Sequence, residues 1–386
     1  HLHNLLSAVA NAARGDKCEL VRDFGYSCGT VNATTQDRYV LEVDRVGKGG
    51  QCNTTPSNAN TCGSPILLVP GILTESGVWF VNFPTQSPGF LLADAGYDVW
   101  AMNTREVAFR SHNLDLKQDN PKYWQWSFDE IGRYDVAAVI DLILNTTGVS
   151  KIPLLAYSQG FSASLVLLST RPEYNDKVEI LMGYGPVSNI AHAGFPFPPL
   201  IAISDILFFI VDPTGDSGYF YLPSIPREAL TLVCGIFGGQ PCSLTLAITM
   251  FVSPEQLNQT RIPVMLAHYP IGTSYQDLHH YVQIYRSDKF QMYDYGKKEN
   301  KRRYGQTDPP AYPLERISVR VALFTSKGDV LADPRDVAGL VETLGSRVLF
   351  NRVVPQDSFR HLDFVTGYNA TEFLHKPLLD ALKNLA

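Results

Sequence analysis

The 386-residue sequence has no uninterrupted apolar run that approaches the roughly 18 residues of a membrane span. Its most apolar stretch, 198–211, is broken by Asp205. It also lacks a basic stripe that could neutralise the phosphates of a nucleic acid, because its net charge is −6 and its one basic cluster, 297–303, is interrupted by Glu299. These absences argue against a transmembrane anchor and against a nucleic-acid partner.

The cysteines show no C-x-x-C or histidine spacing typical of zinc, so the sequence predicts no metal site. The six cysteines lie in three close pairs: Cys18 with Cys28, Cys52 with Cys62, and Cys234 with Cys242. Spacing alone cannot choose among the connectivities that six cysteines permit. We prefer local pairing, because each pair would close a small loop of polar or turn-forming residues.

Five N-x-[ST] sequons are present, at Asn32, Asn53, Asn145, Asn258 and Asn369. This density of glycosylation signals, together with paired cysteines, is typical of the secretory route. The chain begins at His1 without a methionine or a signal sequence, which indicates a processed product. We therefore expect an exported protein, secreted or lysosomal, with the extracellular destination favoured.

Apolar runs of strand length alternate with longer helix-compatible segments. The runs are 66–69, 97–102, 152–156, 178–182, 319–324 and one that begins at Val348. Their near-continuous apolar character predicts strands covered on both faces, as in a parallel sheet, and the alternation favours an α/β fold. A hairpin is expected around 39–43, and the Gly/Asn/Ser-rich segment 47–64 is expected to be a loop.

Residues 127–144 have the apolar spacing of a helix, with Ser127 or Asp129 as its N-cap. The expected apolar face holds Ile131, Tyr134, Val139, Ile140 and Ile143. Between about 186 and 313 the pattern becomes rich in aromatics and prolines. The predicted organisation is a core first part at 1–185, a cap or lid insertion at 186–313 and a core second part at 314–386. The aromatics of the insertion either form their own core or cover an apolar binding cleft.

The segment 152–160, IPLLAYSQG, ends an apolar run in a serine, and a helix-compatible segment follows it. This is the strand–turn–helix context of a nucleophile elbow. The turn needs small neighbours because the strand and the helix pass close together. Gly160 meets that need, and Ala156 is the smallest replacement for the usual first glycine. The segment predicts Ser158 as the nucleophile of an acyl transfer.

A serine nucleophile needs a histidine base and an acid that orients it, in the chain order Ser, Asp, His for this architecture. Asp329 follows the apolar run that ends at Phe324, and His361 follows the run that begins at Val348. We prefer His361 to His375, which lies near a predicted C-terminal helix. The competing acids, for which capping or solvent exposure is expected, are Asp333, Asp336, Asp357 and Asp363.

An oxyanion hole requires two backbone N–H donors. One donor is expected from Gln159, the residue after the nucleophile. The second is expected from the loop after the first major strand, where Pro70 has no N–H but Gly71 and Ile72 keep theirs.

Several ordered segments of the chain resemble the acid lipases, the family that includes the gastric and lysosomal acid lipases, across nearly the whole length. These segments are GVWF at 77–80, LLADAGYDVW at 91–100, NTR at 103–105, WSFDE at 126–130, KFQMYD at 289–294, DVLADP at 329–334 and HLDF at 361–364. Such a series is far more specific than the serine motif alone.

The resemblance implies an α/β-hydrolase fold with a mostly parallel central sheet, helices on both faces and an inserted cap. It implies hydrolysis of lipid esters such as acylglycerols or sterol esters, with no metal and no organic cofactor, and with a lipid–water interface as the setting. The implied roles are Ser158 as nucleophile, Asp329 as acid, His361 as base, and Ile72 and Gln159 as oxyanion donors. The pair Cys234–Cys242 resembles the single disulfide of the family's cap.

The chain departs from the family pattern at three places. H-G-L is replaced by Pro70-Gly71-Ile72, G-H-S-Q-G by an elbow with Ala156 and Tyr157, and N-x-R-G by a segment that ends in Glu106. Because these changes surround the nucleophile, two alternatives stay open. One is a lipid-binding or carrier protein with weak or no turnover, and the other is a short-chain esterase or acyltransferase.

Overall fold

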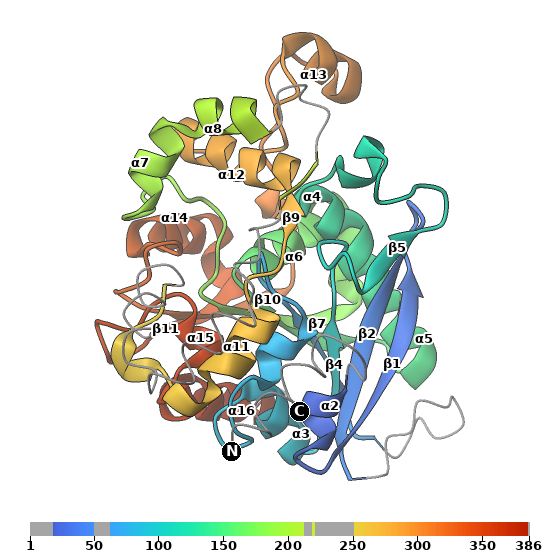
Figure 1. The fold of residues 1–386 in the computed structure, drawn as a ribbon, viewed down its shortest axis with the longest axis vertical. Coiled ribbons are helices and arrows are strands. Elements are labelled where there is room, and N and C mark those ends of the chain that lie inside the picture. Colours follow the sequence, from blue (N-terminus) through green and yellow to red (C-terminus); the bar gives the residue numbers. More distant parts are fainter. Residues whose placement is uncertain (1–17, 50–61, 212–217, 221–250, 385–386) are drawn as a thin grey trace.

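The computed structural model describes residues 18–49, 62–211, 218–220 and 251–384 (Figure 1). Through this part of the chain runs a nine-stranded sheet in the order β1-β2-β4-β3-β6-β7-β10-β11, with β5 paired to β2. The strands are β1 Tyr26–Thr34, β2 Tyr39–Lys48, β3 Pro65–Val69, β4 Asp98–Met102, β5 Ser111–Asn113, β6 Ile152–Tyr157, β7 Val178–Tyr184, β10 Arg320–Thr325 and β11 Val348–Val353. From β4 to β11 all neighbours are parallel, whereas β2 pairs antiparallel with β1, β4 and β5. The mostly parallel sheet confirms the predicted α/β class, and β1 and β2 form the expected hairpin.

Both faces of the central strands are apolar, because successive side chains of a strand point to opposite sides. In β3, Leu67 and Val69 belong to one buried cluster, which includes residues of α5 and α6. Ile66 and Leu68 belong to a second cluster, which includes residues of α3 and α16. These helices are α3 Pro88–Asp94, α5 Ala137–Thr147, α6 Gln159–Thr170 and α16 Lys376–Lys383. The continuous apolar runs therefore correspond to a sheet covered by helices on both faces.

The prediction of two covered faces is wrong for β11. This strand is the last in the sheet order, and Leu349 and Val353 are 46% and 47% exposed. An edge strand has one strand neighbour, so its apolar residues need not be buried to the same extent.

The segment predicted as one helix over 127–144 consists of three parts. They are α4 Phe128–Glu130, a π-helical turn Ile131–Val136 and α5. Ser127, and not Asp129, is the N-cap, and it forms a capping box in which the Ser127 N–H donates to Glu130 Oε2 at 2.8 Å. Of the expected apolar face, Tyr134 is partly exposed while the other four residues are buried.

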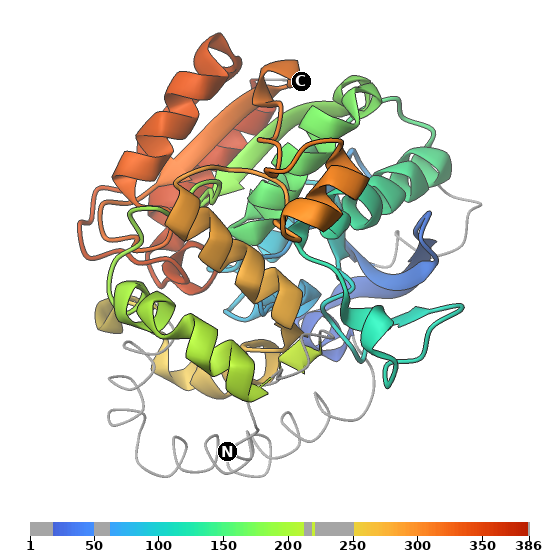
Figure 2. The same cartoon turned by 90° about the horizontal axis from the view of Figure 1, so that it is seen from above.

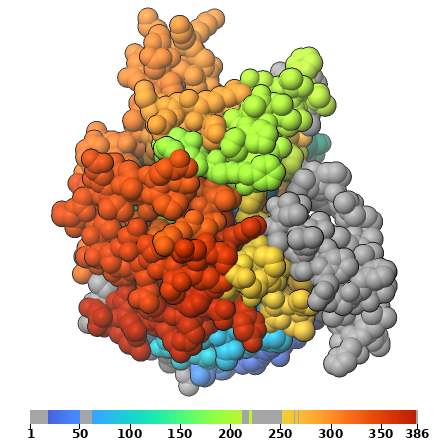
Figure 3. All heavy atoms as spheres, turned by 90° about the vertical axis from the view of Figure 1, so that its left-hand side faces the viewer, coloured from blue at the N-terminus to red at the C-terminus, as the bar shows by residue number. Residues whose placement is uncertain are grey.

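A long segment is inserted between β7 and β10, and several of its side chains line a cavity with Tyr157, the last residue of β6. It contains α7 Phe197–Ala202, α8 Ser204–Val211, β8 Tyr219–Phe220, α11 Ile262–His268, β9 Thr273–Ser274, α12 Tyr275–Ser287 and α13 Lys297–Tyr304. Helices α8 and α12 lie side by side (Figures 1 and 2), joined by the Arg286–Asp205 ion pair. Figure 3 shows α7 and α8 on the outer surface, above the C-terminal part of the core. The domain boundaries at 185 and 313 stay a prediction.

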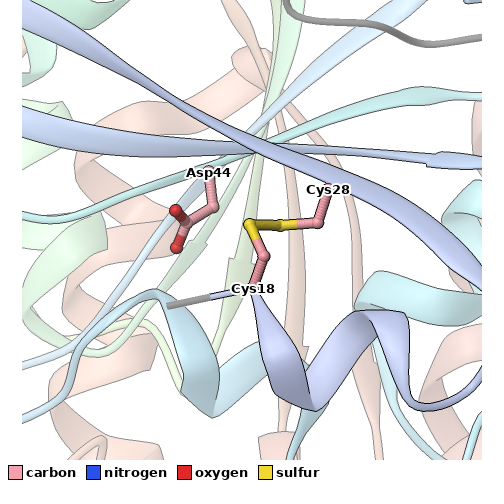
Figure 4. Close-up of side chains that lie close together, drawn as sticks. All are labelled: Cys18, Cys28 and Asp44. Atoms are coloured by element: carbon pink, nitrogen blue, oxygen red, sulfur yellow. A yellow bond between two sulfur atoms is a disulfide. The ribbon is translucent and has the colours of Figure 1, made fainter. Parts of the chain in front are cut away.

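A disulfide joins Cys18, just before α2 (Glu19–Arg22), to Cys28 in β1, which confirms one predicted pair (Figure 4). The two cysteines and Asp44 lie close together, and all three are residue types that can bind metals. Both sulfurs are used in the disulfide, and Asp44 accepts hydrogen bonds from Arg110, so the group gives no basis for a metal site. Cys62 is buried, but Cys52, Cys234 and Cys242 lie outside the described residues, so the other two pairings stay predictions.

The sequons differ in accessibility. Asn32 and Asn145 are exposed, Asn258 and Asn369 are partly exposed, and Asn53 lies outside the described residues. Glycosylation at these positions stays a prediction. Within the described ranges, no helix combines the length and apolar character needed to cross a bilayer.

Candidate active site

Three side chains from distant parts of the sequence meet at one edge of the sheet. Ser158 lies between β6 and α6, Asp329 follows β10, and His361 lies between β11 and α15 (Asp363–Thr366). Because β6, β10 and β11 are parallel through their neighbours, their carboxyl ends lie at the same edge, where α/β proteins place functional groups.

The three side chains form a continuous hydrogen-bonded chain. His361 Nε2 lies 2.7 Å from Ser158 Oγ, and His361 Nδ1 lies 2.8 Å and 2.9 Å from the two carboxylate oxygens of Asp329. Asp329 Oδ1 also accepts the N–H groups of Leu331 and Ala332, at 2.9 Å and 3.0 Å. All three residues of the chain are buried. In this arrangement the imidazole can take the serine proton while the carboxylate fixes the ring and its tautomer.

The backbone at Ser158 is strained. Its φ of 54° and ψ of −121° place a non-glycine residue outside the favoured regions. The Ser158 N–H donates to Tyr184 O at 3.0 Å, which holds the turn against β7. A Cβ on Gly160 would lie 2.4 Å from the carbonyl oxygen of Val69, so glycine is required there. The close neighbour of Gly160 is thus the end of β3, and not β6, the strand that the sequence analysis expected to pass close to this helix.

The expected oxyanion donors flank the serine. Gln159 is the first residue of α6, so its N–H has no acceptor within the helix. On the other side, a Cβ on Gly71 would lie 2.9 Å from Ser158 Cβ, which shows how closely the loop after β3 approaches the nucleophile. Ile72 and Ser158 line the same cavity.

Tyr157, which replaces the histidine of the family pattern, contacts the loop that carries His361. Its hydroxyl donates to the carbonyl oxygen of His361 at 3.0 Å, and the two rings are 5.2 Å apart. Burial raises the pKa of Tyr157 well above its usual value, so the phenol stays neutral and able to donate.

Glu106, the other unusual residue, is buried and contacts the loop after β3 and the start of α6. It accepts the N–H of Leu73 at 3.2 Å and the side-chain amide of Gln159 at 3.3 Å. Burial, followed by the neighbouring Asp277 charge, raises the pKa of Glu106 well above its usual range. The sequence could single out this residue as unusual, but it gave no signal of its contacts.

The rejected candidates have other roles. Asp333 is the N-cap of α14 (Pro334–Leu344), as expected, and Asp357 is exposed. The expected capping or solvent exposure is wrong for two of the acids. Asp336 is buried against His192, and Asp363 is buried and accepts backbone N–H groups. His375 is hydrogen-bonded to Tyr184, and burial lowers the pKa of His375 to about 3.

An apolar cavity of about 440 Å³ opens beside Ser158 and His361. Aromatic residues of the inserted segment, Phe197, Phe208 and Phe220, form part of its lining. Of the two interpretations of these aromatics, the arrangement favours a cover over an apolar binding cleft.

Comparisons with known proteins agree with this geometry. Residues 18–83 match the family described as the partial alpha/beta-hydrolase lipase region. Gastric triacylglycerol lipase of Bos taurus is 32% identical over 376 residues, which cover 94% of this chain and 90% of the relative. Lipase member K of Homo sapiens is 30% identical over 366 residues, which cover 94% and 89%. A solved carboxylesterase structure from Bacillus subtilis has a TM-score of 0.50 at 13% identity, with 99% of this chain and 98% of that chain covered, and supports the fold alone.

Proposed function

The chain belongs to the acid lipase family, and on this basis we propose that it is a serine ester hydrolase that cleaves carboxylic esters of lipids, such as acylglycerols or sterol esters. The observation that carries the proposal is the hydrogen-bonded chain Ser158–His361–Asp329, which opens into an apolar cavity. A proton relay of this kind activates a serine hydroxyl, and the cavity beside it suits an acyl chain.

In the first half-reaction, Ser158 Oγ attacks the ester carbonyl carbon while its proton passes to His361 Nε2. The negative charge on the carbonyl oxygen is stabilised by the N–H groups of Ile72 and Gln159. The C–O bond to the alcohol then breaks, and the alcohol leaves with the proton from His361. Asp329 stabilises the imidazolium during both transfers. The product on the protein is an acyl ester of Ser158.

In the second half-reaction, His361 removes a proton from water as the water oxygen attacks the acyl carbon. The same two N–H groups stabilise the second oxyanion. Its collapse breaks the bond to Ser158 Oγ, which recovers its proton from His361. The fatty acid is released and the free serine is restored.

The apolar cavity determines the substrate class in this proposal. Each buried methylene of an acyl chain contributes about 0.8 kcal/mol, so binding strengthens with chain length until the cavity is filled. A cavity of about 440 Å³ lies within the range of ligand-binding pockets. Long acyl chains are therefore preferred to acetyl groups.

Helix α8 supports contact with a lipid surface. Ile206, Phe209 and Ile210 are 64%, 70% and 67% exposed, while Leu207 and Phe208 of the same helix line the cavity. An exposed apolar surface beside a lipid-binding cavity suits an interface of aggregated substrate. The sequons and the cysteine pairs support an exported protein, secreted or lysosomal, with the extracellular destination favoured.

The test is an ester panel of increasing acyl length, assayed between about pH 4 and pH 8 beside the Ser158→Ala variant. We expect wild-type turnover on long-chain esters, loss of turnover in Ser158→Ala, and labelling of Ser158 by an alkyl phosphonate. Full activity of Ser158→Ala would contradict the proposal. Retention of bound fatty acid with no ester cleavage would support a carrier, and preference for the shortest esters would support a short-chain esterase.

A further inference from the structure

Glu106 lies where two segments of the active site approach each other. It belongs to the loop between β4 and β5, and its side chain is fully buried. One carboxyl oxygen, Oε1, accepts the N–H of Leu73, next to Ile72, at 3.2 Å. The other oxygen, Oε2, accepts from the amide of Gln159 at 3.3 Å and from the hydroxyl of Thr104 at 3.4 Å. One carboxyl group therefore joins both segments that carry the oxyanion N–H groups.

The loop after β3 needs such support, because its backbone is strained. Leu73 has a φ of 59°, which is unfavourable for a residue with a side chain and persists only where the surroundings impose it. Two hydrogen bonds hold the backbone of Leu73 in this conformation. The Leu73 N–H donates to Glu106, and the Leu73 carbonyl accepts from the Ile271 N–H at 2.8 Å. Loss of either bond would allow the loop to relax away from the nucleophile.

The surroundings of Glu106 restrict how it can move. Thr273 and Asp277, from β9 and the start of α12, face the same carboxyl group, and the Tyr219 hydroxyl donates to the Glu106 carbonyl at 3.4 Å. Gln159, on the other side, is buried, and its Oε1 has no hydrogen-bond partner within the part of the chain that the structure describes. The carboxyl is thus held in place by the fold, and its hydrogen bonds are directed at the active-site segments.

We propose that Glu106 is a positioning residue of the oxyanion hole, which fixes the Ile72 loop against the N-terminus of α6 through Leu73 and Gln159. The inference rests on the proposed ester hydrolase function. Because the oxyanion forms after substrate has bound, a displaced N–H donor slows the chemical step and leaves binding in the apolar cavity nearly unchanged. The expected signature is a change in kcat with little change in KM.

The experiment compares Glu106→Ala, Glu106→Gln and Glu106→Gly with wild type on one long-chain ester. We expect Glu106→Ala and Glu106→Gly to lower kcat about 10- to 100-fold, with KM within about threefold, because a misplacement on the order of 1 Å has such an effect. Glu106→Gln should recover most of the lost kcat. The side-chain oxygen of the introduced glutamine still accepts the Leu73 N–H. After a half-turn of the Gln159 amide, the unpartnered Gln159 Oε1 can accept from the side-chain NH₂ of that glutamine.

Glu130→Ala is the matched control. Glu130 also accepts a backbone N–H, that of Ser127 at 2.8 Å, but within the described residues it has no hydrogen bond to Ile72, Leu73 or Gln159, so kcat should stay within about twofold of wild type. Circular dichroism verifies folding. If Glu106→Ala does not fold, the kcat values of Glu106→Gly and Glu106→Gln are compared to test the inference.

Two results would overturn the inference. One is a kcat of Glu106→Ala or Glu106→Gly equal to that of wild type, and the other is an equal loss in Glu106→Gln and Glu106→Ala. With an active wild type and an inactive Ser158→Ala, either result overturns this inference alone. A wild type without ester hydrolysis, or an active Ser158→Ala, removes the proposed function and the inference with it.

Discussion

The Tyr157 hydroxyl donates a hydrogen bond to the His361 carbonyl oxygen, so the residue before Ser158 holds the loop that carries His361. The oxygen-to-oxygen distance is 3.0 Å, and both residues are buried. The phenol of Tyr157 thus links the turn at Ser158 to the loop that carries His361.

Replacement of Tyr157 by phenylalanine should test this link. The His361 carbonyl would lose a buried donor, which costs about 1–3 kcal/mol of unfolding free energy. The base loop would be less well placed, so we expect kcat to fall roughly 3- to 10-fold. Urea unfolding and steady-state kinetics measure the two effects. Unchanged stability together with unchanged kcat would show that the hydrogen bond has no role.

Glycine at position 71 should be essential for turnover. An added Cβ would lie 2.9 Å from both Ser158 Cβ and Tyr157 Cδ1, so Gly71→Ala must displace the loop or the elbow. We expect kcat to fall about 100-fold. The control is Gly339→Ala in α14, where an added Cβ meets no atom within 4 Å. That variant should keep its kcat and gain about 0.5–1 kcal/mol of stability, because alanine is the better helix former. Equal kcat values for the two variants would contradict the prediction.

The stability of the protein should depend on pH through Asp277. Burial raises the pKa of Asp277 from 3.8 to about 7. The folded state therefore keeps this proton to higher pH than the unfolded chain. The resulting stabilisation is complete below about pH 4 and is lost as the pH rises through about 7. Asp277→Asn cannot ionise, so its unfolding free energy relative to that of wild type should increase by about 3 kcal/mol from pH 4.5 to pH 8. Urea unfolding at several pH values measures this difference, and parallel curves for the two proteins would contradict it.

The exposed side of α8 should matter for aggregated substrate and not for dissolved substrate. Replacement of Ile206, Phe209 and Ile210 by serine removes apolar surface without touching the cavity lining. We expect hydrolysis of an emulsified long-chain ester to fall about 10-fold, since each buried apolar side chain is worth about 1.5–3 kcal/mol and only part of it enters the interface. Cleavage of a soluble short-chain ester should be unchanged. Leu207→Ser, which alters the cavity itself, should impair both reactions, and an equal loss on both esters in the triple variant would exclude an interfacial role.

The sequence was most informative where one local rule determines the structure. The apolar runs before Ser158 and Asp329 had to be buried strands, and the small residue at Gly160 had to allow a close passage of helix and strand. Capping was one of the two roles expected for Asp333, and Asp333 is the N-cap of α14. The strands follow from the apolar pattern and the cap from its neighbours in the chain, whereas the close contact of Gly160 is with Val69 of β3.

The features that the sequence could not predict depend on contacts between distant segments. Glu106 meets Leu73 and Gln159 only because three loops converge, and no local pattern records such a meeting. The position of β11 at the sheet edge is a property of the strand order, so its apolar composition misled the prediction. The π-helical turn before α5 lies against a distant segment: a Cβ on Gly132 would lie 2.3 Å from the carbonyl oxygen of Ala163 in α6.

The positive φ of Ser158 places stability and reactivity in opposition at this position. Glycine tolerates a positive φ, whereas serine loses about 1–3 kcal/mol by adopting it. Ser158→Gly should therefore make a sturdier molecule, with a higher melting temperature, that has no nucleophile.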